Sequence, residues 1–375
     1  MGSDGAALTE QRAMRCLHVA SGDGWGGAEV SAFHLIVELA ARPDVDVRCV
    51  TLNEGTLSAK LTAAGVPVDV IPERHGLREV TRRLDRIVRE HQIELLHSHR
   101  YKEHLAAGWV ARRQSIPHLR SAHGRAPSLR FEGRLHGVGP FLDRLLASIW
   151  GADWIAVSHD LAHEMTGLRQ RVSVVRNGIP AASPPSDRAT LEQPFGSPAW
   201  IVGFVGRFEA VKRPDRFLRL FERLPYKIQD RPVYGWMIGD GPLRAQLQRA
   251  AEETGLARRI HFAGARDDAV ELLGALDLLV LPSDHEGHPM VLLEAMRAGV
   301  PLVASRVGGL QELGDLPWLT PAGNDTALVE AVQRLLSNDE LRQSWADDLR
   351  RRFDQEGSIV GSADQVLDLY REALK

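Results

Sequence analysis

Short apolar runs of strand length alternate with helical patterns along most of the chain. Helical stretches such as AEVSAFHLIVELAAR (28–42) and LREVTRRLDRIVREH (77–91) separate the runs in the first half, and RFLRLFERL (216–224) and LVEAVQRLLS (328–337) do so in the second. The strand-like runs are CLHVA, VDVRCVTL, IELLHSH, IPHLRSAH, WIAVS and VSVV, then WIVGFVG, VYGWMIG, IHFAG, DLLVLPS, PLVAS and PWLT. This alternation predicts an α/β fold with helices on both faces of a parallel sheet.

The stretch PAASPPSDRATLEQPFGSP (180–198) divides the two halves. It is rich in Pro, Ser and Ala and has no hydrophobic period, so we interpret it as a linker. We therefore expect two Rossmann-like, doubly wound domains, over residues 1–185 and 195–354, that face each other across a cleft. Because ligands of such sheets bind at the carboxyl ends of the strands, the residues that follow each strand are the most informative ones.

Composition is that of an ordinary soluble protein. The chain has 375 residues, of which 44% are hydrophobic and 25% charged. Its two cysteines, Cys16 and Cys49, lie in strand-like runs and are expected to be reduced core residues. The first residues lack an apolar signal core, and no apolar run has the length of a membrane span, so we expect a cytoplasmic protein that is at most peripheral to the inner face of the membrane.

Charge is distributed unevenly. Residues 1–180 carry a net charge of +3 and the remainder −6, and eight basic residues lie between Arg100 and Arg134 against two acidic ones. Together with the apolar residues that follow, segment 100–150 could contact an anionic membrane surface or an anionic, lipid-linked acceptor. The alternative is that the apolar residues of this segment pack under the first domain.

The stretch SDHEGHPMVLLEAMRAG (283–299) places two carboxylates around a helix start. Pro289 suits a first helical residue and Gly299 a helix end, so we predict a helix over about 289–298. Glu286 then precedes the helix and Glu294 lies more than one turn inside it. A helix N-terminus attracts phosphate, whereas carboxylates on either side of it accept hydrogen bonds from hydroxyl groups. A nucleotide sugar has both kinds of group.

Other strand ends add candidate ligands. GRFEAVKRP puts Arg207 and Lys212 within one turn after a strand, where two cations suit a diphosphate. GDGWGG matches G-x-G-x-x-G before a helix, which leaves open a dinucleotide site and hydride transfer. However, Glu29 lies in the first turn of that helix and would compete with a pyrophosphate for its N-terminus.

The motifs GRFEAVKR, IGDGP, SDHEGHPMVLLEAMRAGVPLVASRVGG and GGAE together resemble glycosyltransferase family 4, the retaining nucleotide-sugar enzymes of GT-B fold. The resemblance covers most of residues 15–325. It implies a UDP-sugar or similar donor, a glycan, glycolipid or small-molecule hydroxyl as acceptor, and a C-terminal helix (355–375) that crosses back onto the first domain.

The resemblance also implies roles for individual residues. Arg207 and Lys212 would neutralise the diphosphate, Glu286 would contact the sugar hydroxyls, and Glu294 would hold the ribose. The remaining contacts with the nucleotide-sugar donor would come from Gly26, Gly27, Gly239, Arg266, Gly287, His288, Pro289, Met290 and Val291. His288 stands where the family has an apolar or aromatic residue, so the identity of the sugar stays open.

The expected mechanism uses no metal ion. The chain has no D-x-D pair in a plausible strand-end loop and no cluster with metal-ligand spacing, so cations and the helix N-terminus would stabilise the leaving diphosphate. The resemblance places His123 at a family position near the reacting centre, although a histidine that makes a structural hydrogen bond in the cleft is an equally good interpretation. His97 and His99 are weaker candidates. No nucleic acid is expected as a partner, and an epimerase or a non-catalytic nucleotide-sugar binding protein of the same fold is the main alternative.

Overall fold

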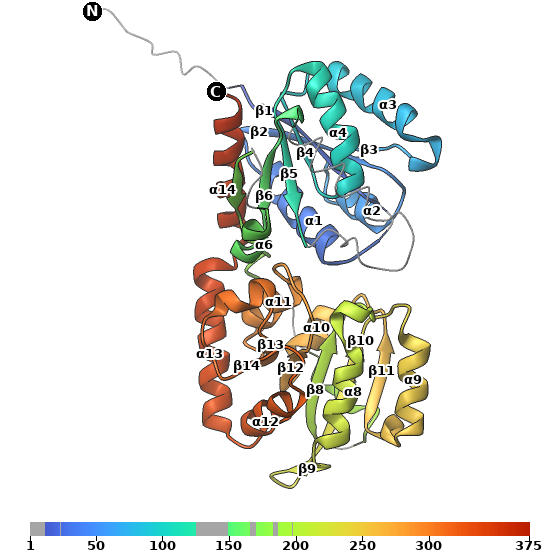
Figure 1. Cartoon of the computed structure of the whole chain (residues 1–375), viewed down its shortest axis with the longest axis vertical. Coiled ribbons are helices and arrows are strands. Elements are labelled where there is room, and N and C mark those ends of the chain that lie inside the picture. The colour runs from blue at the N-terminus through green and yellow to red at the C-terminus, as the bar shows by residue number, and fades with distance from the viewer. Residues whose placement is uncertain (1–11, 23, 125–148, 166–169, 183–186, 197) are drawn as a thin grey trace, which may run out of the picture.

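The computed structural model describes residues 12–375 apart from 23, 125–148, 166–169, 183–186 and 197. It contains two α/β domains of similar design, one above the other in Figure 1. Each has a mainly parallel sheet with helices on its faces, as the alternation of apolar runs predicts.

The N-terminal domain is built on a parallel sheet of order β3-β2-β1-β4-β5-β6-β7. Side chains of β1 alternate between two cores: Cys16 and Ala20 face one helix layer, whereas Leu17 and Val19 face the other. Both cysteines are buried and free, as expected. The strands are β1 Met14–Ala20, β2 Val45–Thr51, β3 Val68–Val70, β4 Leu95–Ser98, β5 His118–Ala122, β6 Asp153–Ala156 and β7 Val172–Val174. The helices are α1 Gly27–Ala40, α2 Thr56–Ala63, η1 Glu73–His75, α3 Leu77–Glu90, α4 Tyr101–Gln114 and α6 His159–Glu164.

The C-terminal domain has a sheet of order β11-β10-β8-β12-β13-β14, to which the short β9 adds an antiparallel edge. One large apolar core fills this domain. The strands are β8 Trp200–Val205, β9 Lys227–Ile228, β10 Arg231–Ile238, β11 Ile260–Gly264, β12 Leu278–Leu281, β13 Leu302–Ser305 and β14 Leu319–Thr320. The helices are α7 Arg188–Glu192, η2 Ala210–Lys212, α8 Pro214–Arg223, α9 Arg244–Glu253, η3 Leu256–Arg258, α10 Ala269–Gly274, α11 Met290–Ala298, η4 Gly308–Leu313, α12 Asp325–Leu336 and α13 Asp339–Glu356.

The last helix, α14 (Ile359–Ala373), packs on the N-terminal domain beside α1 (Figure 1). Its buried residues follow helical spacing and enter the core that also contains Cys16 and Cys49. The chain crosses between domains twice at one place, where Ile179 N–H donates to the Gly357 carbonyl at 3.0 Å and Ile359 N–H donates to the Ile179 carbonyl at 3.1 Å. Residues 355–356, which we assigned to the crossing helix, are the end of α13 instead.

The linker interpretation of residues 180–198 is wrong for its central part. Arg188–Glu192 forms α7, which Asp187 caps by accepting from Thr190 N–H at 3.1 Å. Leu191 is fully buried in the C-terminal core, and Arg188 donates to Asp277 at 2.9 Å. One buried leucine and the contacts of Arg188 with Asp277 and Glu192 anchor this helix, and none of them produces a period that a sequence scan would detect.

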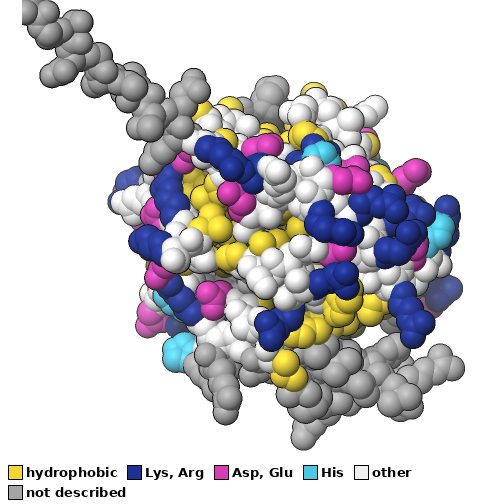
Figure 2. Space-filling view, turned by 90° about the horizontal axis from the view of Figure 1, so that it is seen from above, with side chains coloured by type: hydrophobic (Ala, Val, Ile, Leu, Met, Phe, Trp, Pro, Cys, Tyr) yellow, Lys and Arg dark blue, Asp and Glu magenta, His cyan; other side chains and the backbone are white. Residues whose placement is uncertain are grey.

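The basic segment does not form one charged face in the part that the structure describes. Arg120 is fully buried beneath the ring of Trp154, and Arg100 pairs with Glu29 at 2.7 Å. Figure 2 shows basic side chains interspersed with acidic ones at this end of the molecule. Residues 125–148, which include most of the apolar part of the segment, lie outside the described residues. Among the helices that are described, none is long and apolar enough to cross a membrane.

Candidate functional site

The loop at residues 283–289, here the Glu286 loop, is fixed against two neighbouring segments. Asp284 N–H donates to the Val211 carbonyl at 2.8 Å, and Gly309 N–H donates to the Glu286 carbonyl at 3.1 Å. At Gly308, φ is +50° and a Cβ would lie 1.7 Å from the Glu286 carbonyl oxygen. A Cβ on Gly309 would likewise lie 1.8 Å from the Gly287 carbonyl oxygen, so only glycine fits at both positions of the SRVGG stretch.

Glu286 and Lys212 form an ion pair in this loop. Lys212 Nζ lies 2.6 and 2.8 Å from the two carboxylate oxygens of Glu286, and the Ser283 hydroxyl donates to the same carboxylate at 2.6 Å. Glu286 is 4% exposed. Both Glu286 oxygens lie within hydrogen-bond distance of the ammonium group, so an incoming anion would compete with Glu286 for Lys212. The two residues to which we assigned separate tasks are therefore direct partners.

Two helix N-termini face each other across the cleft. A Cβ on Gly27, the first residue of α1, would lie 3.7 Å from Met290 Cγ, the first residue of α11. Pro289 is the N-cap of α11 and not its first helical residue, a shift of one position from the prediction. No side chain caps α11 and its first turn holds no acidic residue, so its partial positive charge is available to an anion.

The N-terminus of α1 is already occupied by a carboxylate. Glu29 accepts from Gly26 N–H at 3.1 Å and from Arg100 at 2.7 Å, in agreement with the competition expected from its place in the first turn. Arg207 lies beside Gly26 and pairs with Glu209 at 2.7 Å. An anion would thus bind at α11 in preference to α1, in a cleft that Arg207 and Lys212 also line.

A cleft of about 760 Å³ lies between the domains and contains most of the predicted site. Its volume is in the range of small-molecule sites. The predicted residues that line it are Gly26, Gly27, His123, Arg207, Lys212, Glu286, Gly287, His288, Pro289 and Met290. A Cβ on Gly287 would lie 2.5 Å from the His123 carbonyl oxygen, so the two domains approach each other closely at the base of the cleft.

Four predicted residues do not line this cleft: Gly239, Arg266, Val291 and Glu294. Gly239 lies where the ends of β8 and β10 meet, since a Cβ there would be 2.0 Å from the Gly206 carbonyl oxygen. Arg266 pairs with Asp268 at 2.6 Å. Burial raises the pKa of Glu294 to about 7, against a weaker opposing effect of Arg297. Val291 follows Met290 in the first turn of α11.

His123 is the cleft end of a buried hydrogen-bonded chain of side chains. Burial, and secondarily the charge of Arg100, lowers the pKa of His123 to about 4, so its imidazole is neutral near pH 7. Its Nδ1 is buried and makes no hydrogen bond to any described residue. The successive contacts are His123 Nε2 to His99 Nδ1 (3.4 Å), His99 Nε2 to His18 Nδ1 (2.9 Å), His18 Nε2 to Tyr370 Oη (3.2 Å), Tyr370 Oη to His97 Nδ1 (2.5 Å), and His97 Nε2 to Ser121 Oγ (2.8 Å).

Three of these histidines, His18, His97 and His99, are close enough to suggest a metal site, with ligand atoms within 4.8 Å of one another. All six of their ring nitrogens, however, have a hydrogen-bond partner. Burial lowers the pKa of each well below its usual value, so each is a neutral ring with one donor and one acceptor. The hydrogen bonds of these ring nitrogens are complete without a metal ion, so we interpret the three histidines as part of the hydrogen-bonded chain.

His288 lies between the cleft and a second cavity. It lines both, and burial lowers its pKa to about 4. Asn177, which we did not predict, fixes its backbone: the Asn177 amide donates to the His288 carbonyl at 2.7 Å and accepts from the Ser31 hydroxyl at 2.6 Å. One side chain therefore joins α1 of one domain to the Glu286 loop of the other.

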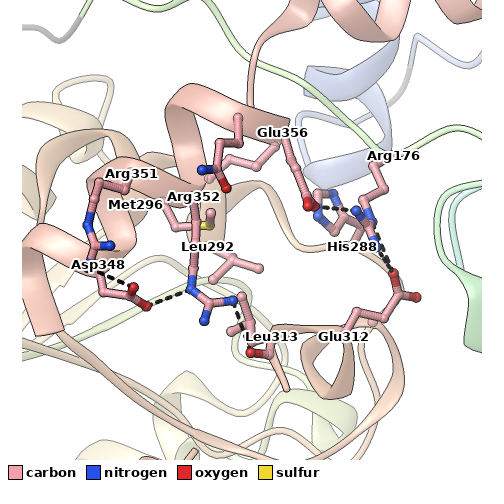
Figure 3. A pocket seen from close by; sticks show the side chains of 13 residues that line it. Arg176, His288, Leu292, Met296, Glu312, Leu313, Asp348, Arg351, Arg352 and Glu356 are labelled. Atoms are coloured by element: carbon pink, nitrogen blue, oxygen red, sulfur yellow. Dashed lines mark hydrogen bonds and ion pairs between the residues drawn. The ribbon is translucent and has the colours of Figure 1, made fainter. Parts of the chain in front are cut away.

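The second cavity, of about 250 Å³, lies behind the Glu286 loop (Figure 3). Arg176 reaches into it from the N-terminal domain and donates to Glu312 at 2.8 and 3.0 Å and to Glu356. Arg352 is similarly bound to Asp348 at 2.6 Å. The ion pairs of Arg176 therefore join the two domains at this cavity, whereas the pair of Arg352 and Asp348 lies within α13.

The sequence contained weak signals for some of the residues that we missed. Asn177 precedes a glycine directly after a strand, which is a turn signal but not a functional one. Tyr370 is one of many apolar-face positions on α14. Their roles depend on contacts with distant segments.

Comparisons with known proteins agree with this architecture. Residues 188–352 match the family of group 1 glycosyl transferases, and residues 25–183 match Glycosyltransferase Family 4. A D-inositol 3-phosphate glycosyltransferase from Corynebacterium efficiens is 31% identical over 311 residues, which cover 75% of this chain and 72% of that protein. The N-acetyl-alpha-D-glucosaminyl L-malate synthase of Bacillus anthracis is 25% identical over 303 residues, 77% of each chain.

Among solved structures, Anabaena HepE in complex with UDP and glucose superposes with a TM-score of 0.83 at 20% identity, over 96% of this chain and all of that one. The same protein is also known with UDP-glucose. At this identity the likeness establishes the fold alone. Taken with the family matches on both halves and the Corynebacterium relative, it shows that the chain belongs to glycosyltransferase family 4 and is a glycosyltransferase of GT-B fold.

Proposed function

We propose that this glycosyltransferase moves a sugar from a UDP-sugar to a hydroxyl group of a carbohydrate, glycolipid or small molecule, with retention of configuration and without a metal ion. The observation that carries the proposal is the ion pair of Glu286 and Lys212 beside the uncapped N-terminus of α11. The complexes of HepE with UDP and UDP-glucose support the choice of nucleotide. We further propose a cytoplasmic location.

In this proposal the diphosphate lies at the start of α11, between Lys212 and Arg207. The free N–H groups of the first turn and two cations would stabilise the negative charge that develops on the leaving oxygen. Glu286 would accept hydrogen bonds from sugar hydroxyls. Glu294 would hold the ribose one turn further along α11, with Arg266 near the base.

The chemistry replaces one C–O bond by another. The bond between the anomeric carbon and the diphosphate oxygen breaks, a bond from that carbon to the acceptor oxygen forms on the same face, and the hydroxyl proton passes to the leaving phosphate. Among the cleft carboxylates, Glu29, Glu209 and Glu286 are each paired with an Arg or Lys. We propose that Arg207, Lys212 and the N-terminus of α11 stabilise the leaving group in place of a divalent ion, so EDTA should leave the transfer rate unchanged.

Substitutions at the ion pair provide the sharpest test. Glu286→Gln removes a negative charge next to the diphosphate and releases Lys212, so UDP should bind several-fold more tightly while turnover of the UDP-sugar falls. Lys212→Ala should weaken UDP binding by about 1.5 to 3 kcal/mol, whereas Lys227→Ala, an exposed lysine on β9, should not. Calorimetry with UDP and initial rates with UDP-glucose would measure both effects.

Product analysis completes the test. NMR of the product should show the anomeric configuration of the donor, and incubation of the donor without acceptor should give no epimerised nucleotide sugar. If Glu286→Gln and Lys212→Ala both bind UDP and turn over the donor like the parent, the donor site is misplaced. Glu294→Gln should weaken UDP and UDP-glucose equally, because it would lose only a ribose contact.

A further inference from the structure

Glu103 is a buried carboxylate in the wall of the cleft. It is the third residue of α4, is 1% exposed, and lines the cleft with His99, His104 and His123. Neither of its carboxylate oxygens makes a hydrogen bond to any residue that the structure describes. Buried polar groups in native proteins almost always have partners, so an unpartnered carboxylate in a ligand cleft calls for an explanation.

The nearest cations do not satisfy this carboxylate. Arg100 pairs with Glu29 at 2.7 Å, and Lys102 pairs with Glu73 at 3.0 Å. Burial raises the pKa of Glu103 to about 7, and the charges of Arg100 and Lys102 and its own backbone N–H lower it only in part. Ionisation of the Glu103 carboxyl is therefore unfavourable, and no described residue donates a normal hydrogen bond to it. A ligand that donates hydrogen bonds to the carboxylate would stabilise its charged form.

This inference rests on the proposed function. We propose that Glu103 belongs to the acceptor site and accepts hydrogen bonds from neighbouring hydroxyl groups of a neutral polyol, such as a sugar or a cyclitol. Above its pKa of about 7 the carboxylate can only accept, so the group that it binds must donate, and a phosphate or carboxylate at the same place would meet a like charge. Glu103 lies on the N-terminal wall, on the same side as His123, whose backbone touches Gly287 of the Glu286 loop. A hydroxyl held there faces the donor side of the cleft.

A purely structural role accounts less well for the geometry. An acidic residue in the first helical turn is favoured by the helix dipole, but such residues are usually exposed and share their oxygens with backbone N–H groups or water. Glu103 has neither exposure nor a hydrogen bond of normal geometry. Glu29, at the equivalent place in α1, makes both a backbone hydrogen bond and an ion pair, which shows what a satisfied first-turn glutamate looks like in this fold.

The experiment measures polyol binding to the full chain saturated with UDP. The probes are myo-inositol and methyl α-D-glucoside as neutral polyols, and L-malate and glycerol 3-phosphate as anions. The variants are Glu103→Gln and, as a matched control, Glu90→Gln, which removes an exposed carboxylate at the end of α3 in the same domain, outside the cleft. Calorimetry gives the dissociation constants for UDP alone and for each probe in the presence of UDP.

We expect at least one neutral polyol to bind the parent, and Glu103→Gln to weaken it about ten-fold or more while leaving UDP binding unchanged. In the parent this affinity should fall as the pH is lowered through about 7 and Glu103 is protonated, whereas in Glu103→Gln it should not vary over that range. Glu90→Gln should behave like the parent. A role confined to folding would change neither the polyol affinity nor its pH dependence.

Two results would overturn the inference: equal polyol affinity in Glu103→Gln and the parent, or binding of the anions alone, with no neutral polyol bound at its highest soluble concentration. The proposed function fails separately, when the parent binds no UDP at all. If UDP binds and Glu103→Gln has no effect on the polyol, only the acceptor assignment is wrong.

Discussion

Acidification should destabilise this protein steeply between pH 7.5 and 5.5. Besides the half-buried His261, eight described histidines have pKa values that burial holds below the ordinary value of 6.5. They are His18, His97, His99, His104 and His118, each well below it, and His34, His123 and His288, each at about 4. They stay neutral in the folded chain over this range but take up protons once it unfolds. The unfolded state therefore binds more protons as the pH falls, and stability decreases.

The size of the effect follows from the titration curves. A histidine with an unfolded pKa of 6.5 that stays neutral when folded lowers the free energy of unfolding by about 1.4 kcal/mol between pH 7.5 and 5.5, so eight lower it by about 11 kcal/mol. Glu103 and Glu294 act in the opposite direction. Their folded pKa values of about 7 lie above the unfolded value, so they bind protons first in the folded state. Each offsets about 2 kcal/mol of this decrease, so the free energy of unfolding should fall by about 7 kcal/mol in total, which is comparable with the whole stability of many domains.

Urea unfolding at pH 7.5, 6.5 and 5.5, followed by circular dichroism, would measure this loss. Two variants should change it with opposite signs. His104→Gln should reduce the loss by about 1.4 kcal/mol, because one proton-accepting group disappears from the unfolded chain, whereas Glu103→Gln should increase it by about 2 kcal/mol. A free energy of unfolding that changes by less than about 2 kcal/mol over this range, or two variants that shift the loss in the same direction, would refute the reasoning.

Three further predictions concern single positions. Gly308→Ala should destabilise the protein by about 3 kcal/mol, because φ is positive and the added methyl group meets a carbonyl oxygen, whereas Gly361→Ala in α14, where nothing lies within 4 Å, should stabilise it slightly in thermal unfolding. Tyr370→Phe should cost about 2 to 4 kcal/mol in urea, because two buried histidine nitrogens lose their partner; an unchanged midpoint would contradict the hydrogen-bonded chain. Burial raises the pKa of Cys16 to about 12 and that of Cys49 higher still, so neither thiol should react with Ellman's reagent until urea unfolds the chain.

The parts of the fold that are encoded locally could be predicted from the sequence. Each of the long strands coincides with an apolar run, and α11 begins and ends within one residue of the prediction, because Pro289 and Gly299 are strong local signals. The short β3 and β9 escaped notice because Asp69 and Lys227 leave them without an apolar run, whereas β7 and β14, which are equally short, lie in the apolar runs VSVV and PWLT. The same limit explains α7, whose five residues are held by tertiary contacts and not by a pattern.

The candidate site was predictable where one stretch of chain carries it. Glu286, Pro289 and Met290 share a loop and a helix start, so their proximity follows from sequence spacing alone. The chain of hydrogen bonds that ends at His123 was not predictable, because His18 and Tyr370 are 352 positions apart and meet only after the last helix docks on the first domain. A periodicity scan identifies Tyr370 as a core residue, but only the fold shows which polar groups its hydroxyl reaches.

The ion pair of Lys212 and Glu286 bears most directly on how the donor would bind. The two residues are 74 positions apart, and the sequence motifs assign Lys212 to the diphosphate and Glu286 to the sugar hydroxyls. In the fold they satisfy each other, so a ligand that separates them must offer an anion to Lys212 and a hydrogen-bond donor to Glu286. A nucleotide sugar provides both in one molecule, whereas free UDP provides only the anion and leaves Glu286 buried without its cation. It follows that the parent should prefer UDP-glucose to UDP, and that Glu286→Gln, which has no charge to leave unpaired, should lose that preference.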